Sequence, residues 1–154
     1  MMTSNEEIEL FLSKFVRDYI FHFNMLERNI AYSLRHVNKQ DSGSTSIESL
    51  LAMSFCKKIS KLKNIISEQS LDREFCEWLE TIDRCRTVRN RLVHGHWEVL
   101  WHLDKPIRFD ACQNKSSNQS KDEGDYTIES LSEELIELKK VAEDFSRLRH
   151  KYEN

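Results

Sequence analysis

Residues 75–97 read FCEWLETIDRCRTVRNRLVHGHW, a stretch in which apolar residues recur at steps of three and four. That spacing is typical of a helix with one buried face. The apolar positions are Phe75, Trp78, Ile82, Cys85 and Leu92. Gly95 follows them, and glycine is common directly after the last turn of a helix. The stretch therefore predicts an amphipathic helix that ends at Gly95.

Arg89 stands on this apolar stripe, between Cys85 and Leu92. A buried arginine without a compensating charge is strongly destabilising. Arg89 therefore requires a protein partner, a ligand or a water-filled cleft. A glutamate of another helix is one such partner, and it would make Arg89 a structural residue.

Two polar residues follow Arg89 on the same predicted helix. Asn90 and His94 are four residues apart and share one face. Arg89 and His94 are five apart, which separates them by about 140° around an ideal helix. The two side chains converge only if the helix loosens near its end, or if a second copy of the chain faces the first.

Arginine, an amide and histidine together suit phosphate chemistry. Arginine binds phosphate oxygens through two N–H groups and stabilises developing negative charge. Histidine can move a proton to or from a ribose hydroxyl or a leaving oxygen. RNA cleavage by this route requires no metal or cofactor, because the 2′-hydroxyl serves as an internal nucleophile. The alternative is that His94 only caps or packs against the helix end.

Three pairs of residues with capping-box spacing predict the starts of three further helices. The pairs are Ser4 with Glu7, Thr45 with Glu48, and Ser130 with Glu133. Apolar residues at helical steps continue these helices to about residues 38, 66 and 148. Four helices with short connections predict an all-α chain folded as an up-and-down four-helix bundle. We expect a single domain over residues 1–154.

The segment between the third and fourth helices has a different pattern. Trp97 and Val99 alternate with polar residues, DKP resembles a turn, and Ile107 and Phe109 alternate on its far side. This pattern predicts a β-hairpin insert over about residues 97–112, with Pro106 at the turn. The polar stretch that follows predicts a mobile loop over about residues 113–125. The residues YTIES after it are consistent with a further short strand.

The stretch KKISKLK gives the second predicted helix a row of lysines. We expect Lys57, Lys58, Lys61 and Lys63 on its outer side. A lysine row is ordinarily a solvated helix face, and the alternative is a surface that attracts anions. On the first helix, Phe11, Phe21 and Met25 lie off the apolar stripe. They predict a second contact face for another helix or another subunit.

Composition excludes several classes of protein. The net charge of -3 excludes a generic polyanion binder, so any contact with nucleic acid has to be local. No apolar run approaches the ~20 residues that span a bilayer, and the acidic N-terminus does not resemble a signal peptide. The four cysteines lack metal-site spacing. We expect a cytoplasmic protein with reduced thiols and no membrane partner.

The string RNRLVHG, residues 89–95, resembles the signature of the HEPN superfamily, a group of small helical-bundle proteins. In that signature an arginine is followed by a polar residue and, a few positions later, by a histidine. Arg89, Asn90 and His94 match these positions. The context is similar too, since the motif lies late in a helix that follows a long first helix and precedes a final amphipathic helix.

The resemblance implies a metal-independent endoribonuclease. By the family pattern His94 is the general acid/base, Arg89 clamps the phosphate and Asn90 positions the reacting groups. Active members typically work as homodimers with their motifs facing each other, an arrangement that lets Arg89 and His94 of different copies share a cleft. Many are toxins or phage-defence effectors, and many such toxins are neutralised by an antitoxin protein. The expected partners are therefore RNA, a second copy of the chain and a cognate antitoxin.

Three residues beside the motif are the expected RNA contacts. Arg86 and Arg91 add positive charge to the helix, and Trp97 offers a ring on which a base can stack. Trp101 is a similar candidate in the hairpin. The structural alternative is that these tryptophans cover the open end of the bundle.

Two other functional classes stay open at this stage. Some members of the family do not cut RNA, so a non-catalytic helical module for interaction or RNA binding is the second hypothesis. A metal site through His94, His96 and His102 is the third. It is disfavoured because a His-x-His pair points to opposite sides of a strand and no carboxylate completes a ligand set.

Overall fold

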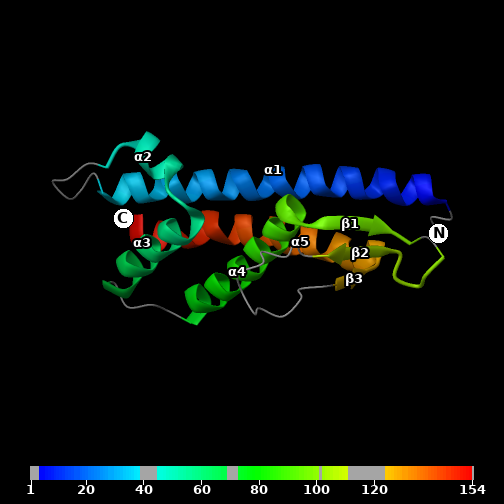
Figure 1. The fold of residues 1–154 in the computed structure, drawn as a ribbon. Coiled ribbons are helices and arrows are strands. Elements are labelled where there is room, and N and C mark those ends of the chain that lie inside the picture. The colour runs from blue at the N-terminus through cyan, green and yellow to red at the C-terminus, as the bar shows by residue number, and fades with distance from the viewer. Residues whose placement is uncertain (1–3, 39–44, 69–72, 101, 111–123, 154) are drawn as a thin grey trace, which may run out of the picture. The chain divides into compact units, whose positions relative to one another are not determined.

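The computed structural model describes residues 4–38, 45–68, 73–100, 102–110 and 124–153. Helices make up most of them, which confirms the helical class (Figure 1). The long helices are α1 (Asn5–Asn38), α4 (Arg73–His94) and α5 (Ile128–Leu148). The shorter ones are α2 (Ile47–Ala52), α3 (Phe55–Glu68) and α6 (His150–Glu153). Gly95 ends α4, as predicted.

The chain divides into two compact units. Unit one comprises Met1–Phe21 and Asp83–Leu138, and unit two comprises His22–Ile82 and Lys139–Asn154. The division falls inside α1, α4 and α5, so each long helix contributes residues to both units. The single domain over residues 1–154 stays a prediction.

Hydrogen-bonded caps explain where the helices begin. At α1 the capping box is confirmed, since Ser4 Oγ accepts from Glu7 N–H at 3.2 Å and the Glu7 carboxylate accepts from Ser4 N–H at 3.3 Å. The other two predicted caps were wrong by a few residues. Ser46, not Thr45, caps α2. At α5, Thr127 and Ser130 satisfy each other's backbone N–H at 3.0 Å.

The predicted second helix is in fact two helices. Met53 takes an extended backbone conformation and ends α2, and Ser54 Oγ then accepts from Lys57 N–H at the start of α3. The Lys58 side chain on α3 donates to Leu51 O on α2 at 3.2 Å and to the Glu27 carboxylate on α1 at 2.6 Å. Its side chain is only 1% exposed. Its placement on the outer side of the helix was therefore wrong.

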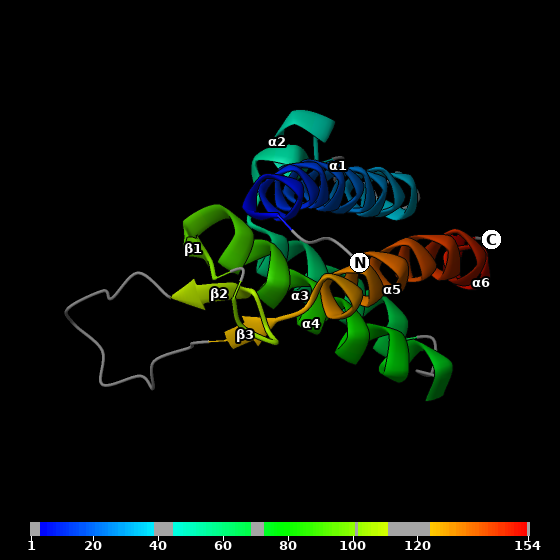
Figure 2. The same ribbon diagram turned by 90° about the vertical axis from the view of Figure 1, so that its right-hand side faces the viewer.

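A three-stranded antiparallel sheet lies in unit one, and β2 is its central strand (Figure 2). The strands are β1 (His96–Val99), β2 (Ile107–Asp110) and β3 (Gly124–Tyr126). The predicted hairpin is confirmed, because Trp97 pairs with Phe109 and Leu100 N–H donates to Pro106 O. Most of the predicted mobile loop lies outside the described residues. Its last two residues, Gly124 and Asp125, instead form part of β3.

In unit one a buried tyrosine joins α1 to α4. Tyr19 is fully buried, and its hydroxyl donates to Cys85 O at 3.2 Å. Arg84 on α4 reaches Glu137 on α5 at 2.7 Å. Burial raises the pKa of Tyr19 well above its usual range and raises that of the Cys85 thiol to about 11. Cys85 is therefore a neutral core residue.

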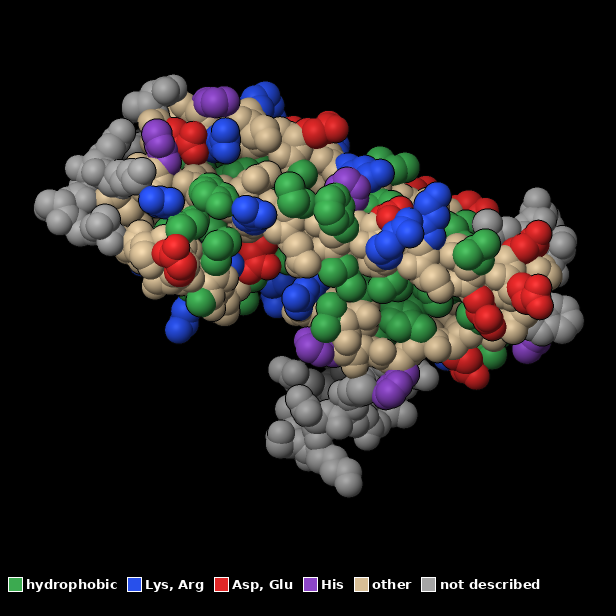
Figure 3. Space-filling view, turned by 90° about the horizontal axis from the view of Figure 1, so that it is seen from above, with side chains coloured by type: hydrophobic (Ala, Val, Ile, Leu, Met, Phe, Trp, Pro, Cys, Tyr) green, Lys and Arg blue, Asp and Glu red, His purple; other side chains and the backbone are tan. Residues whose placement is uncertain are grey.

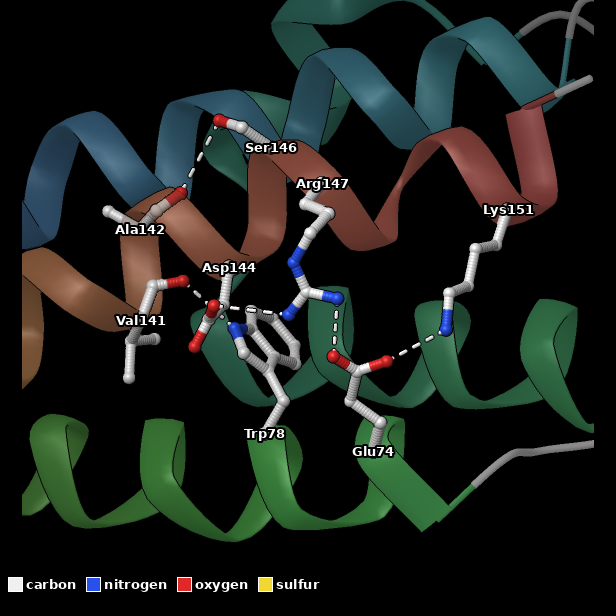
Figure 4. A network of polar contacts seen from close by, with 8 residues as sticks. All are labelled: Glu74, Trp78, Val141, Ala142, Asp144, Ser146, Arg147 and Lys151. Carbon is white, nitrogen blue, oxygen red and sulfur yellow. Dashed lines mark hydrogen bonds and ion pairs between the residues drawn. The ribbon is translucent and has the colours of Figure 1, made fainter.

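In unit two a buried indole joins α4 to α5. Trp78 donates through Nε1 to Val141 O at 2.9 Å (Figure 4). At the C-terminal end, the Tyr152 hydroxyl lies 2.8 Å from Ser33 Oγ, which also donates to Glu153 at 2.6 Å. These contacts hold α6 against α1. The core of this unit thus combines apolar packing with satisfied polar groups.

Beside Trp78, Glu74 at the start of α4 binds two basic side chains of the C-terminal region. Its carboxylate pairs with Lys151 at 2.8 Å and with Arg147, which also bonds Asp144 (Figure 4). Hydrogen bonds from Lys151 and Arg147 lower the pKa of Glu74. The charged side chains of this network are between 34% and 53% exposed, so its contribution to stability is small.

Apolar side chains on the surface of α1 lie among charged ones (Figure 3). Phe11 is half-buried and stacks on Phe15 at 6.1 Å. Phe21 and Met25 are exposed, by 60% and 43%. The second contact face expected from these three residues is therefore partly covered within the chain, and its further partner stays a prediction.

Candidate functional site at the end of α4

α4 is helical up to His94, and the five apolar residues of the predicted stripe are all buried. Val88 and Leu92 continue the buried stripe beyond Cys85, at 8% and 7% exposure. Arg89 lies beside that stripe and is half-buried. The side chain is therefore not inside the core, where a guanidinium would need full compensation, but at its margin.

Arg89 has one hydrogen bond within the described residues. Its Nη1 donates to Asn90 Oδ1 at 3.2 Å, which fixes the guanidinium beside the amide. Its Nε is buried and has no acceptor among the residues that the structure describes. Buried donors without an acceptor are rare in folded proteins and call for a specific explanation. Trp97 Nε1 and Arg149 Nε are in the same state among the described residues, and Arg89 differs from them in lying beside Asn90 in the motif. A ligand with an acceptor oxygen would satisfy the Arg89 donor.

His94 is the last residue of α4, and its side chain is exposed. Because α4 stays helical up to this residue, the helix does not loosen between Arg89 and His94. The two side chains therefore leave one helix about 140° apart. The loosening of the helix that the sequence allowed does not occur, and convergence through a second copy of the chain stays a prediction.

The flanking arginines are engaged within unit one. Arg86 bonds Asp83 on its own helix at 2.9 Å. Arg91 donates to the Tyr126 hydroxyl on β3 and lies over the Phe109 ring, with 5.8 Å from its guanidinium carbon to the ring centroid. Both residues were predicted as RNA contacts. The structure gives each of them a protein partner as well.

Trp97 packs within the sheet and is half-buried. Its ring lies 5.0 Å from that of Phe109 and 6.0 Å from that of Tyr126. Its Nε1 is buried without an acceptor among the described residues. Trp101, the other candidate of the hairpin, lies outside the described part of the chain.

Tyr126 and Phe109 lie beside the end of α4, although the sequence did not predict them as residues of this site. Together with Arg91 and Trp97 they join the last turn of α4 to all three strands. The alternation of the hairpin identified Phe109 as one of its apolar positions, but no local signal paired Tyr126 with an arginine 35 positions earlier. This arginine–aromatic cluster holds the sheet beside the end of α4.

Glu134 on α5 is a titratable group of the same unit. Burial raises its pKa, the neighbouring Glu137 raises it further, and Arg84 and Arg91 oppose the shift. Glu134 therefore gains a proton more readily than an exposed glutamate does. No hydrogen bond of the described residues links Glu134 to Arg89 or His94, so it is not assigned to the site.

No group of three His, Cys, Asp or Glu side chains that could hold a metal ion occurs among the described residues. His94, His96 and His102, which formed the metal hypothesis, are each exposed and make no such group. Within the described residues, no helix is long and apolar enough to cross a bilayer.

No family model matches the chain, and no curated protein or solved structure matches it significantly. The chemistry of the site is therefore argued from its residues. The Arg89 guanidinium, held by Asn90, can bind an oxyanion, and the exposed imidazole of His94, on another side of the same helix, can transfer a proton.

Proposed function

We propose that the chain is a metal-independent endoribonuclease of the HEPN type, with its site at Arg89, Asn90 and His94. The observation that carries the proposal is the buried Nε–H of Arg89, which meets no acceptor among the described residues. Leaving such a donor unpaired is costly. A phosphate oxygen is the acceptor that a guanidinium binds best.

The proposed reaction assigns one task to each residue. His94 accepts the proton of a ribose 2′-hydroxyl as its oxygen attacks the adjacent phosphorus. The bond between the phosphorus and the 5′-oxygen breaks, and that oxygen takes up a proton from water as it leaves. Arg89 binds the phosphate while charge builds on it, and Asn90 holds the guanidinium through Oδ1. The products are a 2′,3′-cyclic phosphate and a free 5′-hydroxyl.

The proposal includes a homodimer. One copy of α4 carries Arg89 and His94 on different sides, so a cleft with both groups requires the motif of a second copy. The four-helix bundle of the HEPN type belongs to the same proposal, as do a role as a toxin or phage-defence effector and control by an antitoxin protein.

A non-catalytic interaction or RNA-binding module is the second candidate. It is favoured by the engagement of Arg86 with Asp83 and of Arg91 with Tyr126, because both arginines then have structural roles. In that case Arg89 and His94 would contribute to binding and not to bond cleavage.

The test is RNA cleavage by the purified chain in the presence of a metal chelator. We expect His94→Ala to lower the cleavage rate by about 100-fold or more, which is the usual contribution of a general acid/base. Arg89→Lys keeps the charge but loses the two-pronged phosphate contact, and should also cut slowly. End-group analysis of the wild-type products should find a 2′,3′-cyclic phosphate.

His96→Ala is the matched control, because His96 is an exposed histidine two residues beyond His94. It should cut RNA at the wild-type rate. Helicity by circular dichroism and mass in solution should be the same for both histidine variants. The proposal fails if the wild type cuts no RNA, or if His94→Ala cuts as fast as the wild type.

A further inference from the structure

α3 ends with Glu68, and before that residue its charged side chains are all lysines. Lys57, Lys61 and Lys63 are exposed, and no carboxylate of a described residue pairs with any of them. Lys58 is the exception on this helix, because it is buried against Glu27. From residue 55 to residue 67 the helix contains no Asp or Glu.

The exposed residues of α3 form a track along the helix. By the 3.6-residue turn they cover an arc of about 160°, with Lys57 and Lys61 near one edge and Lys63 at the other. The positions between the lysines carry short polar side chains. These are Ser60, Asn64 and Ser67, all exposed. We call this arc, from Lys57 to Ser67, the lysine track.

Two serine side chains between the lysines are held close to the helix backbone by hydrogen bonds. Ser60 Oγ donates to Cys56 O at 2.9 Å, and Ser67 Oγ donates to Asn64 O at 2.9 Å. Both hydroxyls are therefore bent back onto the helix. The lysine side chains, which are much longer, project beyond them on both edges.

The arrangement does not serve the stability of α3. Lys57 and Lys61 are four residues apart, and like charges at that spacing repel. Lys57 also lies in the first turn, where the helix dipole disfavours positive charge. A bound anion would relieve both effects.

We propose that the lysine track binds the phosphate backbone of RNA. Lysine ammonium groups contact phosphates as point charges, without reading sequence. The net charge of -3 confines such an attraction to this local surface. Lipid is disfavoured as the occupant because the apolar side of α3 is already buried at Leu62 and Ile66. The choice of RNA among polyanions rests on the proposed function, whereas the charge argument does not.

The experiment measures binding apart from cleavage. A fluorescent single-stranded 2′-O-methyl RNA, which lacks the nucleophilic hydroxyl, is titrated with the full chain over a series of salt concentrations. The test variant is Lys57→Gln/Lys61→Gln/Lys63→Gln. The matched control is Lys14→Gln/Lys139→Gln/Lys140→Gln, which removes three other exposed lysines and changes the net charge equally.

We expect the test variant to bind roughly 10- to 100-fold more weakly at 0.1 M salt, and the control to bind like the wild type. The slope of log affinity against log salt should fall by about 2 for three lost contacts to a single strand. Equal losses in both variants, or none in either, would overturn the proposal. So would track-dependent binding to anionic vesicles or to polyglutamate while RNA binding stays unchanged.

The two proposals can fail separately. If the wild type cuts RNA through His94 but the track variant binds 2′-O-methyl RNA normally, only the lysine track is wrong. If the track variant loses binding while His94→Ala has no effect on cleavage, only the catalytic proposal is wrong.

Discussion

Gly95 allows the last turn of α4 to meet the sheet. A Cβ atom at this position would lie 1.4 Å from Cε2 of Phe109 and 2.6 Å from Arg91 O. Its φ is outside the left-handed range in which glycine is specially favoured. The requirement for glycine is therefore one of space, since the Phe109 ring occupies the volume that a side chain would take.

We expect Gly95→Ala to destabilise the protein by about 3 kcal/mol, the upper end of overpacking costs, because neither the Phe109 ring nor the backbone carbonyl can move freely. Urea denaturation of both proteins measures the change. His96→Ala, at the next and exposed position, should change the free energy of unfolding by less than about 0.5 kcal/mol. An equally stable Gly95→Ala would show that the ring has room to move.

At the scale of elements, an ion pair and a ring contact join α3 to α1: Lys58 with Glu27, and Phe55 with Phe23 at 5.0 Å. Lys58 on α3 reaches Glu27 on α1 and also satisfies the Leu51 carbonyl at the end of α2. Replacing a buried pair with apolar groups is often tolerated, whereas removing one partner leaves a buried charge without compensation. Removal of Glu27 alone therefore leaves the buried Lys58 ammonium without its counter-charge.

We expect Glu27→Ala to lower the free energy of unfolding by about 3 kcal/mol, because the Lys58 ammonium then remains buried with only a carbonyl partner. The double variant Glu27→Leu/Lys58→Met should recover most of that loss. Denaturant unfolding of the two proteins tests this. A cost below about 0.5 kcal/mol for Glu27→Ala would mean that Lys58 reaches water when its partner is removed.

At the scale of the whole molecule, three buried side chains make the free energy of unfolding depend on pH in the alkaline range. They are Tyr19, Tyr152 and Cys85. Burial raises the pKa of Tyr19 and Tyr152 beyond the usual tyrosine range, and raises that of Cys85 to about 11. In the unfolded chain these groups ionise at about 8.5 for cysteine and 10 for tyrosine. Above those values the folded state holds more protons than the unfolded state, so stability falls as pH rises.

We expect these three groups to leave the free energy of unfolding unchanged near pH 7–8. Above about pH 9 they should lower it progressively. Urea denaturation at a series of alkaline pH values measures the decline. Tyr152→Phe removes one titrating proton and should flatten the curve above about pH 10. A stability that stays level or increases up to pH 11 would contradict the assignment.

The sequence by itself determined the features that depend on near neighbours. Apolar spacing predicted the long helices, alternation predicted the hairpin, and the Ser4–Glu7 cap formed as expected, because a helix turn or a cap involves residues only a few positions apart. The same spacing placed Arg89 on the apolar stripe of its helix, but it could not show that the side chain lies at the margin of the core and not inside it. It also placed Lys58 with the exposed lysines.

Only the tertiary structure decided which side chains became partners. Lys58 is buried because Glu27, 31 positions earlier, meets it, and Arg91 is held by Tyr126, 35 positions later. The buried Arg89 Nε without an acceptor, and the Phe109 ring against Gly95, likewise follow from packing between elements. Such contacts depend on how distant segments fold together, and no local pattern encodes them.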